Sequence, residues 1–168
     1  DWIIERVNIG TSYYHGLEVD QSRRITLNRC TFSGARTSTS GSSVQFDNNL
    51  AGPVNRPATI TTTLVEDVRF SDCRFAARPD TDTYARDIDV NHAAALTLRN
   101  VLFEGCVFEG RALADTTIVG FDANAATVES IAFSRCRFVT THPKADAIYL
   151  ANALTVVRRL SVTDCIFT

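Results

Sequence analysis

The chain has 168 residues, of which 45% are apolar and 21% charged, and its formal net charge is -2. This is the composition of an ordinary globular protein, too apolar and too weakly charged for a disordered chain. A net charge near zero argues against nucleic acid as the partner, because phosphate binding needs a concentrated basic face. No apolar run is long enough to span a bilayer, so no membrane partner is expected. We expect a single domain, residues 1–168.

The most regular feature along the chain is a short motif built around cysteine. All five cysteines stand two residues before a phenylalanine, and an apolar pair lies five and three residues before each cysteine. The cysteine–phenylalanine pairs are Cys30 and Phe32, Cys73 and Phe75, Cys106 and Phe108, Cys136 and Phe138, and Cys165 and Phe167. In four of the five copies another apolar residue lies three positions before the apolar pair. A degenerate sixth copy is read at the start of the chain as Ile4, Val7, Ile9, Ser12 and Tyr14, with Ser12 in the cysteine position.

The spacing within this motif predicts strands that bend. Residues two apart lie on one face of a β-strand, whereas a gap of three breaks that alternation and requires a corner. Another alternating apolar segment precedes most copies, for example around Asp89 and around Gly120. The pattern therefore predicts three short strands per repeat with every apolar residue turned inward. A repeat that cannot bury its own apolar face must stack on copies of itself, as in solenoids.

The copies that run from Ile25 to Phe32 and from Ile131 to Phe138 resemble rungs of the pectin-lyase-like superfamily. Members of that superfamily include pectate lyases, polygalacturonases, alginate epimerases and bacteriophage tailspikes. The resemblance implies an all-β fold, a right-handed single-stranded parallel β-helix with about six rungs and three short strands per rung. It implies less about activity, because enzymes and non-enzymes share these rungs.

The five cysteines allow two interpretations, a disulfide or metal framework and a stack of free thiols. No two cysteines are in a C-x-x-C arrangement and no histidine lies at ligand spacing from one, which disfavours a zinc site. Stacked cysteines with parallel Cβ directions fit disulfide geometry poorly, and an odd number leaves at least one thiol free. We expect a ladder of free, inward thiols that serve as small apolar filler.

Candidate functional residues lie on and just after the strand that precedes each motif. Its outward positions are expected to form a column of Glu18, Gln45, Asp89, Gly120 and Tyr149. Two carboxylates on neighbouring strands are the groups that glycoside cleavage requires, so the predicted catalytic residues are Asp47, Asp89 and Asp122. Arg86 and His92, with Glu18 and Tyr149, are the predicted substrate-binding residues. The alternative is that these carboxylates cap corners by accepting backbone hydrogen bonds.

The leading hypothesis is a carbohydrate-facing β-helix from a phage tailspike or a similar protein of the virion or cell surface, which binds a polysaccharide. Cleavage by hydrolysis or elimination stays open. Catalytic signature segments of the superfamily are incomplete; Gly120, Phe121 and Asp122 match only the start of an epimerase segment. The alternatives are a structural shaft and a secreted bacterial lyase or epimerase. We expect no cofactor, with calcium as an alternative, and a homotrimer or larger assembly. Because both ends of the chain fall within a rung, we expect a fragment of a longer chain.

Overall fold

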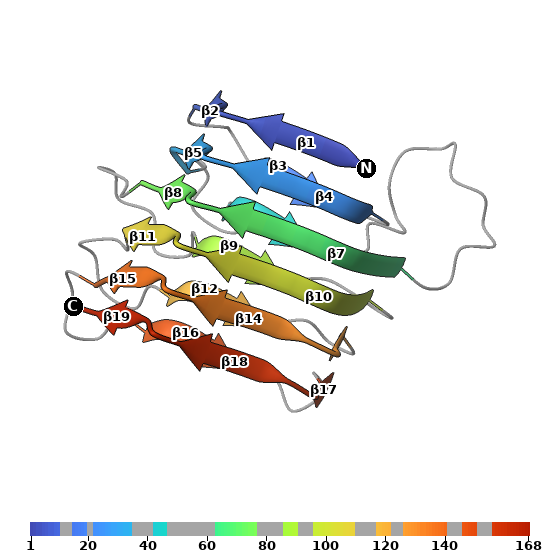
Figure 1. Ribbon diagram of the computed structural model, residues 1–168. Coiled ribbons are helices and arrows are strands. Elements are labelled where there is room, and N and C mark those ends of the chain that lie inside the picture. Colours follow the sequence, from blue (N-terminus) through green and yellow to red (C-terminus); the bar gives the residue numbers. More distant parts are fainter. Residues whose placement is uncertain are drawn as a thin grey trace.

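The computed structural model describes residues 1–10, 15–19, 22–34, 42–46, 63–76, 86–90, 96–109, 117–121, 126–140, 146–150 and 156–168. All regular secondary structure in these ranges is β-strand, and the strands pair in parallel in three sheets (Figure 1). Within the same ranges, no helix has the length and apolarity needed to cross a membrane.

The three sheets are defined by equivalent strands of successive repeats. The large sheet contains β1 (Trp2–Glu5), β4 (Arg23–Asn28), β7 (Thr63–Ser71), β10 (Leu96–Glu104), β13 (Thr127–Val128), β14 (Ile131–Ser134), β17 (Val156–Val157) and β18 (Leu160–Thr163). The small sheet contains β2 (Asn8–Ile9), β5 (Thr31–Phe32), β8 (Arg74–Phe75), β11 (Val107–Glu109), β15 (Arg137–Val139) and β19 (Ile166–Phe167). The third sheet contains β3 (His15–Val19), β6 (Ser42–Phe46), β9 (Arg86–Val90), β12 (Thr117–Phe121) and β16 (Asp146–Leu150). The chain visits the sheets in turn and advances from β1 at one end of the stack to β18 and β19 at the other (Figure 1), an arrangement compatible with a parallel β-helix of three strands per repeat.

The corners fall where the sequence has its gaps of three. The residue immediately before each cysteine has a φ between 51° and 63°, as in Asp72 and Gly105. A second bend lies within the large sheet, where Arg24, Asp67 and Asn100 have φ values of 54° to 56°. The left-handed conformation reverses the alternation of side chains, so that apolar residues on both sides of the bend point inward.

Stacked phenylalanines fill the core. In one ladder Phe75 stacks on Phe32 at 4.9 Å between ring centroids and on Phe108 at 4.6 Å, nearly parallel in both cases. In the other ladder Phe103 stacks on Phe70 at 4.7 Å and on Phe133 at 5.0 Å. Rings of the two ladders meet edge to face, so each ring has an offset-stacked and a tilted neighbour, which are the arrangements that aromatic quadrupoles favour.

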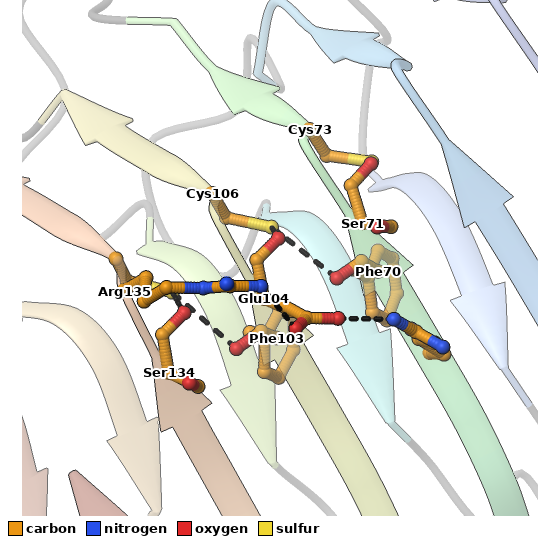
Figure 2. Close-up of polar contacts among 10 residues, drawn as sticks. Phe70, Ser71, Cys73, Phe103, Glu104, Cys106, Ser134 and Arg135 are labelled. Atoms are coloured by element: carbon orange, nitrogen blue, oxygen red, sulfur yellow. Dashed lines mark hydrogen bonds and ion pairs between the residues drawn. The ribbon is translucent and has the colours of Figure 1, made fainter. Parts of the chain in front are cut away.

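The cysteines form the predicted ladder of free thiols beside these rings. All five are unpaired, four are buried and Cys165 is partly exposed. Each sulfur lies near a main-chain carbonyl of the preceding repeat; the Cys106 sulfur is 3.5 Å from the Phe70 oxygen (Figure 2) and the Cys136 sulfur is 3.4 Å from the Phe103 oxygen. Burial raises the pKa of Cys30 and of Cys165. The thiols therefore serve as small apolar side chains that also satisfy carbonyl groups at the corner.

The register of the first repeat differs from the prediction. Trp2 pairs with Ile25 and Ile4 with Leu27, so these two residues are the apolar pair of that repeat. The Val7 carbonyl accepts a hydrogen bond from the Thr31 main-chain N–H, and Val7 precedes β2, where Ile9 pairs with Phe32. Val7 thus occupies the cysteine position, which had been assigned to Ser12. The sequence interpretation failed because the first copy has a valine and an isoleucine where the others have cysteine and phenylalanine.

The outward face of the large sheet carries ion pairs that join successive strands. Arg99 lies between two carboxylates, with Nη1 2.9 Å from Glu66 Oε1 and Nε 2.6 Å from Glu129 Oε2. Glu104 lies in the same way between Arg69 and Arg135, and these arginines lower its pKa. Figure 2 shows Glu104 beside Arg135. Opposite charges in neighbouring strands favour the observed register over a shifted one.

Candidate functional site

The strand register brings the predicted outward residues of the third sheet into one column. Glu18 pairs with Gln45 and Gln45 with Asp89, while Gly120 lies between Asp89 and Tyr149. Their strand neighbours, including Ile88 and Val90, point the other way into the apolar core. Neighbouring parallel strands are about 4.8 Å apart, so the five positions span about 19 Å. The predicted column is therefore present, with its members in the predicted order.

The middle of this column is occupied by a buried ion pair. Arg86 Nη1 lies 2.9 Å from Asp89 Oδ1, and the two side chains are only 15% and 6% exposed. The guanidinium lies over Gly120, since a Cβ atom at that position would come within 2.5 Å of three guanidinium atoms of Arg86. The missing side chain at position 120 thus provides the space in which Arg86 reaches Asp89. In the described structure these two residues contact each other instead of facing solvent.

A set of buried polar groups extends from this ion pair across β6. Among the described residues, the buried polar side chains are Ser42, Ser43, Gln45 and Asp89. Ser42 Oγ lies 2.9 Å from His15 Nδ1 on β3, and Ser43 Oγ donates to Asp87 Oδ1 at 3.4 Å. Ser43, Gln45 and Asp89 lie on the face away from the core, whereas Ser42 alternates with the core residues Val44 and Phe46. Buried polar groups are costly unless they are hydrogen-bonded, so these side chains have to be organised precisely. We use the name polar strip for His15, Ser42, Ser43, Gln45, Arg86, Asp87 and Asp89.

Sequence reasoning missed several members of the polar strip. Asp87 was overlooked although it lies two residues before Asp89, a spacing that places both carboxylates on the outward face of β9. The alternation in the sequence could have identified it. The contact between His15 and Ser42 could not have been found in this way, because 27 residues separate them and their pairing depends on the strand register.

The two ends of the column are the parts open to solvent. Glu18 is exposed on β3, and Tyr149 is 42% exposed on β16. The remaining predicted residues, Asp47, Asp122 and His92, lie outside the described residues. The structure therefore brings four of the predicted site residues into one region, two of them as a buried ion pair and two as exposed groups at its ends.

The chemistry of this region is that of hydrogen bonding and charge recognition. It contains carboxylates, an amide, hydroxyls and a guanidinium, most of them buried, with Glu18 and the ring of Tyr149 exposed at its two ends. Among the described residues, no three histidine, cysteine, aspartate or glutamate side chains are arranged to hold a metal ion. Comparisons with models of known protein families, with curated protein sequences and with solved structures find no match to this chain.

Proposed function

We propose that this chain is a segment of a right-handed parallel β-helix that binds an extended polysaccharide across the outward face of its third sheet. The resemblance of the repeats to pectin-lyase-like rungs supports that fold. A protein of the tailspike type, assembled as a trimer and displayed on a virion or cell surface, is the context that we favour.

The observation that carries this proposal is the in-register column from Glu18 to Tyr149. An extended polymer is bound by groups placed along one line, and the exposed Glu18 and Tyr149 stand at the two ends of this column, about 19 Å apart. The exposed ring of Tyr149 supplies an apolar surface with a polar tip, which suits a sugar with its C–H face and hydroxyls. The polar strip beneath holds the strands that carry these contacts.

Binding is proposed in preference to cleavage because of the state of Asp89. Glycoside hydrolysis needs two carboxyl groups that reach the scissile bond. Asp89 is 4% exposed and bonded to Arg86, so in this arrangement its carboxylate positions an arginine and does not meet a substrate.

The experiment is a binding screen of the chain against an array of bacterial O-antigen and capsular polysaccharides, followed by titration of the best ligand. Tyr149→Ala and Glu18→Gln should each weaken binding about fivefold or more, a loss expected for one contact in a polar site. Leu150→Ala is the matched control, since Leu150 is 53% exposed on the same strand but on its other face. Unchanged affinity in both Tyr149→Ala and Glu18→Gln would contradict the proposed surface.

The ion pairs of the large sheet favour a second candidate, a shaft without a ligand. Alternating charges such as Glu66, Arg99 and Glu129 stabilise the stack itself and need no partner. A screen in which no polysaccharide binds, together with a trimer in sedimentation, would support the shaft.

A further inference from the structure

A second groove lies on the outward face of the large sheet, away from the third sheet. It has a volume of about 600 Å³ and crosses β4, β7, β10, β14 and β18. Its floor is an in-register row of mostly short side chains, which includes Leu102, Ala132 and Ser161. The groove lies beside the bends at Asp67 and Asn100, where φ is positive, and most of the side chains along its floor are short.

One wall of this groove is a chain of hydrogen-bonded polar groups. Asn100 Nδ2 donates to Asp67 Oδ1 at 3.0 Å, and Ser130 Oγ donates to Asn100 Oδ1 at 3.0 Å. The Asn100 main-chain nitrogen donates to Ser130 Oγ at 2.8 Å, which fixes the hydroxyl in place. The wall therefore presents both donors and acceptors, one residue from each of three successive repeats, in fixed positions.

Two arginines line the groove, Arg69 on β7 and Arg159 just before β18. Arg159 lines the groove next to Ser161 and, within the part of the chain that the structure describes, its side chain has no ion-pair partner. Arg69, which also lines the groove, is bonded to Glu104. An unpaired guanidinium is a strong, directional donor for a carboxylate.

We infer that this groove binds an acidic oligosaccharide, with its carboxylate at Arg159 and its hydroxyls along the wall formed by Asp67, Asn100 and Ser130. The apolar part of the floor, Leu102 and Ala132, contacts the C–H face of a sugar ring. This inference rests on the proposed function, the binding of polysaccharide, and adds to it a second face and the sign of the ligand's charge.

Other ligands fit the groove less well. A peptide that adds a β-strand needs a free sheet edge, but the floor strands β7, β10 and β14 are paired on both sides. Nucleic acid would bring one phosphate per residue, while the groove and its border include the carboxylates of Asp67 and Glu104.

The test is a titration of the chain with short oligomers of galacturonate, sialate and hyaluronan, and with neutral maltohexaose and cellohexaose, followed by amide NMR. At least one acidic oligomer should bind, with affinity that falls as salt is raised. Its shifts should centre on the amides of Asn100, Ser130 and Ala132. Arg159→Gln should weaken binding about tenfold, the effect of losing one charge-assisted contact, while Arg159→Lys should retain part of the affinity.

Arg137→Gln is the matched control, because Arg137 is an exposed arginine on the small sheet. Ala132→Phe should fill the groove and abolish binding, whereas Val107→Phe, an outward position of the small sheet, should leave it unchanged. Equal affinities of the Arg159→Gln and Arg137→Gln variants would overturn the inference, as would binding of the neutral oligomers alone. A change of oligomeric state in Ala132→Phe without any sugar binding would assign the groove to a subunit contact instead.

The proposed function and this inference fail in different ways. Shifts confined to Gln45, Gly120 and Tyr149 would support the third-sheet surface and overturn the groove. Shifts confined to the groove, with normal binding in Tyr149→Ala, would overturn the third-sheet surface and support the groove. The absence of binding by every acidic oligomer would overturn the groove inference.

Discussion

Gly120→Ala is the substitution that tests most directly how the candidate site is built. The new methyl group would lie 2.4 Å from Arg86 Nη1 and 2.5 Å from Cζ and Nε, far inside van der Waals contact. An arginine can usually move aside, but this one is 15% exposed and bonded to Asp89 at 2.9 Å. The guanidinium must therefore withdraw from Asp89, which stays buried and loses its ion pair with Arg86.

The expected cost follows from that separation. Removing one partner of a buried ion pair costs about 3–5 kcal/mol, and displacement in place of removal should cost about 2–3 kcal/mol. Replacing glycine by alanine also restricts the unfolded chain, which returns about 0.4–1 kcal/mol. The net loss of unfolding free energy should be about 1–3 kcal/mol. For a chain of this length that corresponds to a fall in Tm of roughly 2–10 °C.

The assay is urea denaturation followed by circular dichroism, with two controls. Gly10→Ala should lose no stability and should show only the gain of about 0.4–1 kcal/mol from the restricted unfolded chain, since no atom lies within 4 Å of a Cβ at that position. In an Arg86→Met background, Gly120→Ala should lose most of its effect, because the guanidinium that it displaces is absent. An equal loss in both backgrounds would show that the role assigned to Gly120 is wrong.

Two further predictions concern the titrating groups. Arg69 and Arg135 lower the pKa of Glu104, and Arg99 lowers the pKa of Glu129. The stabilisation from these two carboxylates is therefore present above the unfolded pKa of about 4.5 and is lost as the pH falls below it. The free energy of unfolding should be lower at pH 3 than at pH 7, and Glu104→Gln should make this difference smaller. The pKa of Cys30 and of Cys165 is raised in the folded state, so the contribution of these thiols to stability is present below the unfolded pKa of about 9 and is lost as the pH rises above it. Because four of the five thiols are buried, native protein at pH 8 should react slowly with a thiol reagent, with partly exposed Cys165 first. All five thiols should react at once in urea, and rapid reaction of all five in the native state would contradict a buried ladder.

Much of the fold could be predicted because the repeated residues are the buried ones. The gaps of three mark the corners, and the positive φ values of Asp72 and Asp67 lie within them. The cysteine ladder was predicted correctly, since an odd number of thiols in equivalent positions of the repeat fits buried filler better than bridges. The first repeat was misaligned because Val7 and Ile9 lack the cysteine and phenylalanine that identify the other copies.

The candidate site was predicted only in part. Alternation along each strand placed Glu18, Asp89 and Tyr149 on the outward face, and the register agrees. Alternation carries no information about which outward side chains are covered, so the burial of Asp89 and its pairing with Arg86 were missed. The groove at Arg159 was missed too, because its wall and floor come from five strands whose alignment depends on the register of the whole stack.

The sequence alone determined which side chains of this protein face the core. A period of two with gaps of three dictates which side chains face the core, and apolar burial is strong enough to impose that pattern on the chain. Only the tertiary structure decided what the outward half does. Outward side chains contact neighbours in adjacent strands, which lie about 30 residues away in the sequence. Whether Arg86 reaches Asp89, and whether Arg159 finds an ion-pair partner among the described residues, therefore depends on contacts that exist only after the repeats have stacked.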